Sequence, residues 1–558
     1  MKKIITGLIL MLCGMQLFSQ TAPNKYWIQF TDKQNSVFSA DRPAEFLSAR
    51  AIERRERYSI IISEQDLPVN QAYIDSLTSV GVTVLNRSKW FNAVTVYTTD
   101  TNHLHRIRLF PFVKQLKSVA RFKSVQPVHD KFSLESVTDM KSGTVIDTTL
   151  LRYGKASRQV GMLNGHILHN QGFQGQGLVI AVLDAGFRRV NVNHAFDSLY
   201  INNQILGGWD FVNNGPLSFA DTEHAHGAQV LSIMAGNLPG ELVGTAPKAS
   251  YYLLRTEDAP TENLVEEDNW IAGAEWADSA GADLINSSLG YTAFDIPALN
   301  HTYSDMDGNT TRITRAADIA AGKGILVVNS AGNEGSIEWH YIGAPADADS
   351  ILTVGAVDSL GNYAIFSSTG PTFDGRIKPN IVAQGQQTAV VGTDGNTFRG
   401  SGTSYSSPVM CGLAACLWQT NRTLPPMKII EAIQLSASRA SNPDSLYGYG
   451  IPDLGKALFL LQGINPIPLD DESLLRIYPN PFTDHLVISF YSHDNQEITI
   501  ELLTMAGKKM FFHKRNVGFT SINNLDINSF SSLPAGMYVV RIVTKTGHYE
   551  QTVIKGSN

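Results

Sequence analysis

The chain has 558 residues, of which 43% are hydrophobic and 17% are charged, and its formal net charge is −7. This length exceeds what one hydrophobic core supports, so several domains are expected. The charge balance argues against nucleic-acid binding, and beyond the N-terminus no segment has the roughly 18 uninterrupted apolar residues of a membrane-spanning helix.

The N-terminus has the pattern of a secretory signal peptide over residues 1–20. Two lysines precede an apolar run from Ile4 to Leu12, and a small residue, Ser19, follows near the expected cleavage site. A lipid anchor on Cys13 is disfavoured, because a leucine precedes it where a small residue is expected. We therefore predict that the mature protein leaves the cytoplasm.

The chain contains three cysteines, and Cys13 would be removed with the signal peptide. Cys411 and Cys416 are five residues apart on a predicted helix. This spacing puts them on different faces of the helix, so we predict no disulfide between them.

Residues 21–123 are predicted to form a small α+β domain. Their hydrophobic patterns predict strands over 25–30, 81–85 and 91–97 and helices over 44–58 and 70–80. No pattern in this region indicates catalysis. Residues 124–155 are polar and weakly patterned, so they are predicted to be a linker and the natural place for a processing cut.

Residues 156–463 have the pattern of an open α/β sheet. Short apolar, β-branched runs over 177–183, 282–286 and 324–329 are typical of strands that are buried on both faces. Helices are predicted over 270–280 and 313–321. In such folds, ligands and chemistry gather at the carboxyl ends of the strands.

Four polar side chains stand at the ends of these predicted elements. Asp184 ends the first strand, and His226 begins a run of small residues. Asn333 lies on a glycine-bounded loop, and Ser404 follows a Gly-Thr turn at the start of an apolar helix. A carboxylate, an imidazole, an amide donor and a serine hydroxyl are the groups that acyl transfer needs.

Each of these residues also has a plainer interpretation, as a turn residue, a structural histidine, a common loop or a helix cap. His224 competes with His226 as the base, and Ser406 and Ser407 compete with Ser404 as the nucleophile. Neither of these serines follows the Gly-Thr turn. The order Asp, His, Asn, Ser, with each residue at an element end, favours a catalytic set.

This set resembles the subtilisin family of serine peptidases, the subtilases. The matching blocks are Val182–Gly186, His226–Gly236, Gly402–Pro408, Ser288-Leu289-Gly290 and Gly244-Thr245-Ala246-Pro247, with the oxyanion asparagine on Asn333. Ala185 and Gln229 depart from the usual residues of the family, but neither is a triad member.

The resemblance implies a three-layer α/β catalytic domain with Asp184, His226 and Ser404 as triad. It also implies that Ser288, Leu289 and Gly290 line the substrate site, and that residues 21–123 are a propeptide that assists folding and inhibits the enzyme. The expected substrates are proteins or peptides, the chemistry needs no cofactor, and a monomer is expected.

Subtilases often bind structural calcium, and the acidic run Asp305–Asn309 is the one segment that hints at it. The run lacks the spacing and the closing glutamate of an EF-hand loop, so a polar turn is favoured. No metal ligands are assigned.

After a linker over 464–475, residues 476–558 are predicted to form a small all-β sandwich. A stabilising or carbohydrate-binding module is one interpretation. Ile477–Pro481, Leu533–Tyr538 and the closing strand instead resemble the C-terminal sorting domain of the type IX secretion system of Bacteroidetes-type bacteria. This resemblance implies export to the cell surface or the medium.

The sequence therefore predicts a secreted serine endopeptidase. The alternative from another class is a catalytically silent surface protein that uses the same fold for binding or adhesion. An α/β-hydrolase is excluded, because its triad begins with serine and no Gly-x-Ser-x-Gly elbow precedes Asp184.

Overall fold

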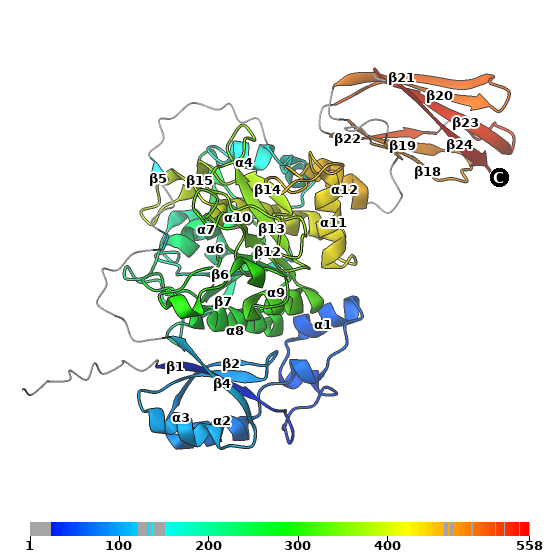
Figure 1. Cartoon of the computed structure of the whole chain (residues 1–558). Coiled ribbons are helices and arrows are strands. Elements are labelled where there is room, and N and C mark those ends of the chain that lie inside the picture. The colour runs from blue at the N-terminus through cyan, green and yellow to red at the C-terminus, as the bar shows by residue number, and fades with distance from the viewer. Residues whose placement is uncertain are drawn as a thin grey trace, which may run out of the picture.

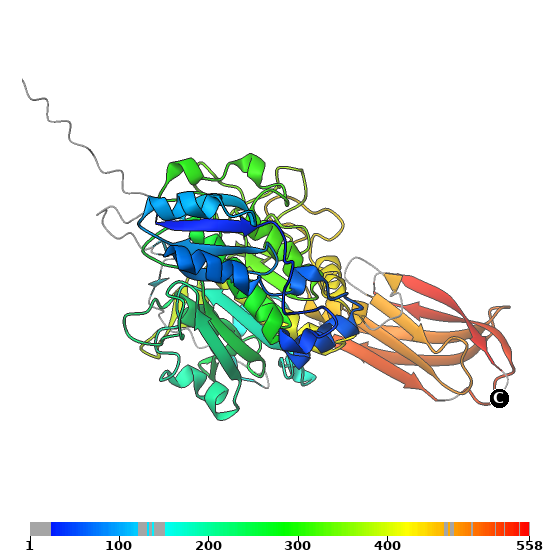
Figure 2. The ribbon, with the colours of Figure 1, turned by 90° about the horizontal axis from the view of Figure 1, so that it is seen from below.

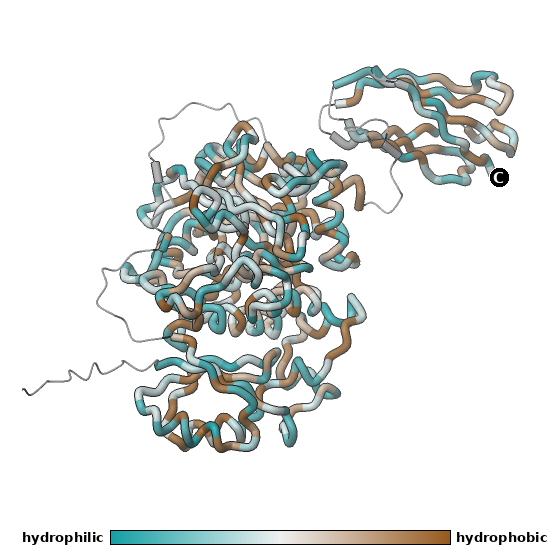
Figure 3. Tube along the Cα trace, viewed as in Figure 1, coloured by the Kyte–Doolittle hydropathy of each residue, from teal (hydrophilic) through white to brown (hydrophobic). Residues whose placement is uncertain are grey.

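The computed structural model of the chain describes residues 24–120, 131–132, 137–138, 151–461, 467–468, 474–492, 495–518, 521–528, 530–545 and 547–556. The predicted signal peptide, residues 1–20, lies outside the described residues. Figure 1 shows a small N-terminal domain (blue), a large central domain and a C-terminal β domain (orange to red) that lies to one side. Figure 3 shows apolar residues (brown) interspersed with polar ones in all three domains.

The N-terminal domain is an antiparallel four-stranded sheet of order β2-β3-β1-β4, against which α2 and α3 pack their apolar residues. Its elements are β1 (Lys25–Phe30), η1 (Pro43–Glu45), α1 (Ala49–Arg57), η2 (Glu64–Asp66), α2 (Gln71–Val80), β2 (Thr83–Ser88), β3 (Ala93–Tyr97), α3 (Thr101–Arg108) and β4 (Val113–Ala120). The helix predicted over 44–58 begins at Ala49, because the N–H of Ala51 donates to Ser48 Oγ (3.2 Å) and caps it there.

Helix α1 docks the N-terminal domain onto α8 (Val265–Ala280) of the central domain, and the view from below in Figure 2 looks onto this domain. Arg54, Arg55 and Lys89 approach the Asp278 carboxylate of α8 to 2.5, 2.9 and 2.9 Å. Burial would raise the pKa of Asp278, but these three cations hold the pKa well below its usual range. Two of the charged residues of the predicted helix, Arg54 and Arg55, are therefore buried contacts.

The central domain is built on a parallel seven-stranded sheet of order β14-β13-β12-β11-β6-β10-β7. Its strands are β6 (Val179–Asp184), β7 (Ile205–Asp210), β10 (Ser250–Arg255), β11 (Leu284–Ser287), β12 (Leu326–Ser330), β13 (Leu352–Val357) and β14 (Ile381–Gln384). Every residue of β6 and β11 to β14 is buried, which explains the continuous apolar runs of the sequence. Shorter strands are β5 (Val137–Thr138), β8 (Asn237–Leu238), β9 (Leu242–Val243), β15 (Thr388–Val391) and β16 (Thr397–Gly400).

Helices cover both faces of this sheet and give the predicted three layers. Helices α7 (His226–Ala235) and α10 (Thr403–Gln419) share one hydrophobic cluster with the sheet, and α8 and α9 (Arg312–Gly322) share another. The remaining helices are α4 (Ser157–Gly161), α5 (His166–Asn170), η3 (His194–Phe196), α6 (Asp197–Ile201), η4 (Pro297–Leu299), η5 (Tyr303–Asp305), α11 (Pro426–Ser436) and α12 (Leu454–Leu461).

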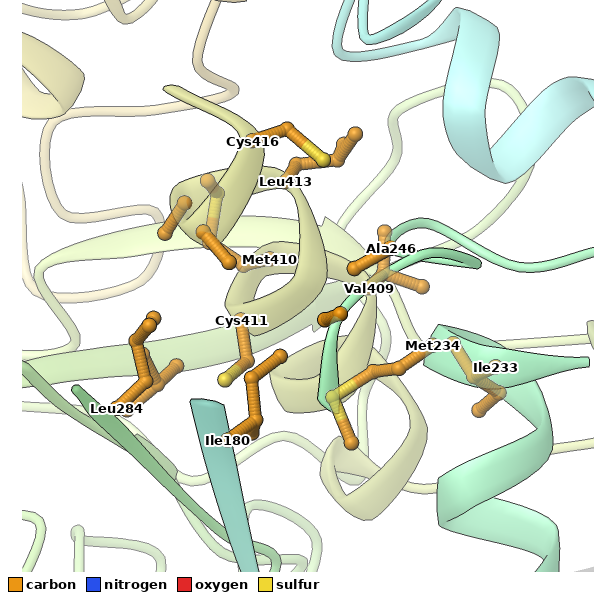
Figure 4. Packing of buried hydrophobic residues seen from close by; sticks show 14 of the residues in the cluster. Ile180, Ile233, Met234, Ala246, Leu284, Val409, Met410, Cys411, Leu413 and Cys416 are labelled. Carbon is orange, nitrogen blue, oxygen red and sulfur yellow. The ribbon is translucent and has the colours of Figure 1, made fainter. Parts of the chain in front are cut away.

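Helix α10 runs through the core, where it carries Cys411 and Cys416. Figure 4 shows Cys411 beside Ile180 and Leu284 of the sheet, whereas Cys416 lies farther along the helix beside Leu413. Both thiols are buried and free, which confirms the prediction that they form no disulfide with each other.

The C-terminal domain consists of two antiparallel four-stranded sheets around one apolar core, as predicted for a β sandwich. Its strands are β17 (Ile467–Pro468), β18 (Leu474–Tyr478), β19 (Leu486–Ser492), β20 (Gln496–Thr504), β21 (Lys509–Val517), β22 (Ser521–Ile527), β23 (Gly536–Val543) and β24 (His548–Lys555). A small apolar cluster of Ile167, Phe459, Leu474 and Tyr491 joins it to the central domain. In the described part of the chain, no helix has both the length and the hydrophobicity to span a membrane.

Candidate active site

Strand β6 is an interior strand of the sheet, and its carboxyl end carries Asp184. Its side chain is fully buried, and Oδ1 accepts a hydrogen bond from the N–H of Ala185 at 2.7 Å. Ala185, one of the two departures from the family pattern, therefore fixes the carboxylate through its backbone. The carboxylate faces the first turn of α7.

His226 is the first residue of α7 and is 2% exposed. Its Nδ1 lies 2.7 Å from Asp184 Oδ1, so the carboxylate accepts the Nδ1 proton and fixes the tautomer of the imidazole. In this tautomer Nε2 is the nitrogen that accepts a proton. This is the orientation in which a histidine acts as general base toward a serine hydroxyl.

Ser404 is the second residue of α10, at the positive end of a 17-residue helix. Its hydroxyl donates to the carbonyl of Ser288 at 3.3 Å, and the hydroxyl of Ser288 donates back to the carbonyl of Ser404 at 2.9 Å. Among the described residues, no hydrogen bond joins the Ser404 hydroxyl to His226. Such bonds are often long or misaligned until substrate is bound.

Asn333 lies on the loop that follows β12. Its Oδ1 accepts from the backbone N–H of Thr403 (2.8 Å) and from the Thr403 hydroxyl (2.9 Å). Because the amide oxygen is used in this way, the amide presents its NH₂ group as a donor on its other side. The next residue, Glu334, is held by Ser368 through its backbone N–H (3.0 Å) and its carboxylate (2.7 Å), which anchors the loop.

A cleft of about 200 Å³ connects these residues. It is lined by Ser404, by Asn333 and by the predicted substrate segment Ser288, Leu289 and Gly290. The structure thus places the predicted nucleophile, the predicted amide donor and the predicted substrate segment around one opening. Asp184 and His226 lie together beside it.

The residues that compete with Ser404 and His226 for the catalytic roles make hydrogen bonds of other kinds. Ser406 and Ser407 are fully buried and donate to the carbonyl of Thr403 (3.0 Å) and to the side chain of Asn286 (3.2 Å). The Nδ1 of His224 accepts from the N–H of His226 at 3.3 Å, so this imidazole supports the start of α7. Gln229, the second departure from the family pattern, accepts from the hydroxyl of Tyr405 at 2.8 Å.

Two residues of the predicted linker also reach the cleft, which the sequence analysis missed. The ring of Phe132 stacks on the His226 imidazole with the centroids 4.1 Å apart, and Lys131 contacts Glu257, Glu262 and Glu266. These partners are separated by 94 to 135 residues, so no local pattern reveals the contacts.

The acidic run considered for calcium forms a turn. The Asp307 carboxylate accepts from the N–H groups of Asn309 and Thr310, both at 2.8 Å, and Asp305 accepts from the N–H of Thr302 at 2.7 Å. Within the described residues, no group of at least three His, Cys, Asp or Glu side chains is arranged to hold a metal.

Comparison with known proteins gives the three regions family assignments. The model of the Subtilase family matches residues 175–450, the Peptidase S8 propeptide domain of Bacteroidota matches 25–134, and the secretion system C-terminal sorting domain matches 476–556. The sorting domain indicates export by type IX secretion, to the cell surface or the medium.

Relatives and a solved structure match the central domain. Subtilisin DY of Bacillus licheniformis is 31% identical over 288 residues, which is 50% of this chain and 89% of that protein. Subtilisin E of Bacillus subtilis is 30% identical over 298 residues, 52% of this chain and 68% of that protein. The solved structure described as "MycP1 with the N-terminal propeptide removed" aligns with a TM-score of 0.43 at 24% identity, covering 56% of this chain and 98% of that one. The chain belongs to the subtilase family of serine peptidases.

Proposed function

We propose that this peptidase is a secreted endopeptidase that cleaves peptide bonds through an acyl-enzyme on Ser404. The Ser404 hydroxyl turns from the Ser288 carbonyl toward His226 and attacks the substrate carbonyl as Nε2 takes its proton. The same proton then passes to the leaving amine, and water, deprotonated by His226, hydrolyses the ester. Asp184 holds the tautomer and stabilises the imidazolium through its 2.7 Å hydrogen bond.

Charge on the tetrahedral oxyanion is stabilised by hydrogen-bond donors that are already in position. The Asn333 amide is one, because Thr403 fixes its oxygen and thereby orients its NH₂ group. A backbone N–H near Ser404, at the start of α10, is the other. No step of this scheme requires a cofactor.

The observation that carries the proposal is the buried Asp184–His226 hydrogen bond beside the helix that presents Ser404. A buried carboxylate and imidazole paired in this geometry have a direct use in acyl transfer. A catalytically silent binding scaffold has no use for the pair, so the silent alternative explains less of the structure.

We also propose that the N-terminal domain inhibits the enzyme until it is removed. The Phe132 ring lies 4.1 Å from the His226 imidazole, centroid to centroid, and residues 131 and 132 line the cleft of Ser404. A substrate cannot occupy this part of the cleft at the same time. The other expected partners are protein or peptide substrates and, through the C-terminal domain, the type IX secretion machinery.

The test is hydrolysis of casein and of fluorogenic peptides by the processed protein and by Ser404→Ala, His226→Ala and Asp184→Asn variants. The proposal expects turnover by the wild type and a loss of about 10⁴-fold or more for Ser404→Ala. Folded wild-type protein that hydrolyses none of these substrates would favour the silent scaffold.

A further inference from the structure

An acidic cluster borders the candidate active site and surrounds the ammonium group of Lys131. Its Nζ lies 2.6 Å from Glu257, 2.8 Å from Glu266 and 3.0 Å from Glu262. The side chains of Glu257 and Glu266 are 1% exposed, and that of Glu262 is 24% exposed. Glu257 and Glu262 also line the cleft that contains Ser404.

Two of these carboxylates are held in place by the catalytic domain itself. Glu257 accepts a hydrogen bond from the hydroxyl of Tyr291. Glu266 accepts from the backbone N–H groups of Asp258 (2.9 Å) and Asn263 (2.7 Å). None of these bonds involves Lys131, so the acidic cluster is a preformed feature of the catalytic domain.

The electrostatics of the cluster depend on the lysine. Burial lowers the pKa of Lys131, but the three surrounding carboxylates more than offset this and raise the pKa well above its usual value. Burial raises the pKa of Glu262 to about 7 and that of Glu266 well above its usual range, against the lowering effect of Lys131. Without a cation, the carboxylates would be buried beside one another with no compensating charge.

Lys131 and Phe132 both line the cleft. The N–H of Lys131 approaches the carbonyl of Ala259 to 3.5 Å, and Phe132 stacks on His226. Both residues fall within the propeptide match, 25–134, whereas the subtilase match begins at 175. A cut after residue 134, where the propeptide match ends, would therefore also remove this lysine from the acidic cluster.

We propose that Glu257, Glu262 and Glu266 form a specificity subsite that takes a lysine or arginine side chain of the substrate. The substrate residue would lie immediately N-terminal to the one that packs on His226, as Lys131 does. A basic side chain restores the charge pairing of the cluster, whereas a neutral one leaves buried carboxylates unpaired. The inference rests on the proposed peptidase function and adds its substrate preference.

Matched peptides test this without any variant. The processed wild-type protein is given fluorogenic peptides that differ only at this position, lysine against norleucine and arginine against citrulline. We expect kcat/KM to be about tenfold or more higher for the charged member of each pair, because a desolvated charge pair is lost in the neutral one. Equal values within each pair would overturn the proposal.

Variants of Glu262, the most exposed member of the cluster, give a second test that does not disturb the fully buried pair. Glu262→Gln is expected to reduce the preference for lysine over norleucine, and Glu262→Lys to abolish it. Glu338→Gln, which removes an exposed acid outside the cluster, is the matched control and should keep the preference. A preference retained in full by both Glu262 variants would contradict the proposal.

The two proposals fail in different ways. Wild-type protein that cleaves peptides and reacts with a fluorophosphonate but shows no preference for basic residues would refute only the subsite. Protein that cleaves none of the peptides and does not react with the fluorophosphonate would refute the peptidase function, and the subsite with it.

Discussion

The aromatic ring of Phe132 lies against the imidazole of His226, with the ring centroids 4.1 Å apart and the planes 24° from parallel. A residue within the propeptide match thus occupies the space beside the imidazole that we propose as general base. This contact predicts that maturation is needed before substrates can bind.

The first prediction concerns this cut. If maturation is autocatalytic, Ser404→Ala should leave the N-terminal region, residues 21–123, covalently attached, because the nucleophile is missing. Mass spectrometry of the purified protein measures the chain length directly. Normal processing of Ser404→Ala would show that another protease performs the cut.

The second prediction concerns the oxyanion donor. Asn333→Ala should lower kcat by about 10²- to 10³-fold with little change in KM, a magnitude taken from the loss of this donor in subtilisin itself. Thr403→Val should cost less, because the backbone N–H of Thr403 still fixes the amide oxygen. Unchanged kcat in Asn333→Ala would remove this residue from the catalytic set.

The third prediction concerns docking of the N-terminal domain. Asp278→Asn removes the carboxylate that Arg54, Arg55 and Lys89 share. Arg55 keeps its ion pair with Asp66, but leaving the buried Arg54 and Lys89 without a carboxylate partner costs about 3 to 5 kcal/mol. In a Ser404→Ala background with the linker cut by an added protease, the released domain should dissociate on size-exclusion chromatography. Glu53→Gln, an exposed change on α1, is the control and should leave the domain bound.

The fourth prediction concerns acid stability. His169 is 2% exposed, Nδ1 lies 2.6 Å from the Tyr153 hydroxyl and Nε2 lies 3.0 Å from the Thr245 carbonyl, and burial lowers its pKa from 6.5 to about 4. Between these pKa values the unfolded chain binds more protons than the folded one, so stability is lost as the pH falls from 6.5 toward about 4. The loss from this residue is on the order of 3 kcal/mol.

The measurement is the melting temperature of the Ser404→Ala protein across this pH range, with and without His169→Gln. The amide cannot titrate, so the variant should be less stable at neutral pH but lose less stability on acidification. An unaltered pH slope would show that His169 does not contribute to acid sensitivity.

These residues also show how far the sequence predicts the structure. The strand over 25–30 coincides with β1, and the runs over 177–183 and 324–329 become β6 and β12 within two residues at each end. Buried parallel strands are continuous and apolar, so the signal is local and strong.

The predicted helix boundaries are wrong where charged residues are buried, because in the sequence such residues have the pattern of a solvent-exposed surface. The helix predicted over 270–280 begins five residues earlier, at Val265, because Glu266, Glu267 and Asp268 look like a loop but are buried. Their partners are Lys131, His301 and Arg312, which lie 34 to 135 residues away in the sequence. Contacts between residues so far apart in the sequence bring the acidic cluster and Lys131 together. The pattern of any one segment cannot predict such contacts.

The most direct test of the account is reaction of the processed wild-type protein with a fluorophosphonate, followed by peptide mapping of the adduct. The account predicts one covalent adduct, on Ser404, which is absent in Ser404→Ala and formed much more slowly in His226→Ala. An adduct on Ser406 or Ser407, or no adduct on folded and processed protein, would contradict it.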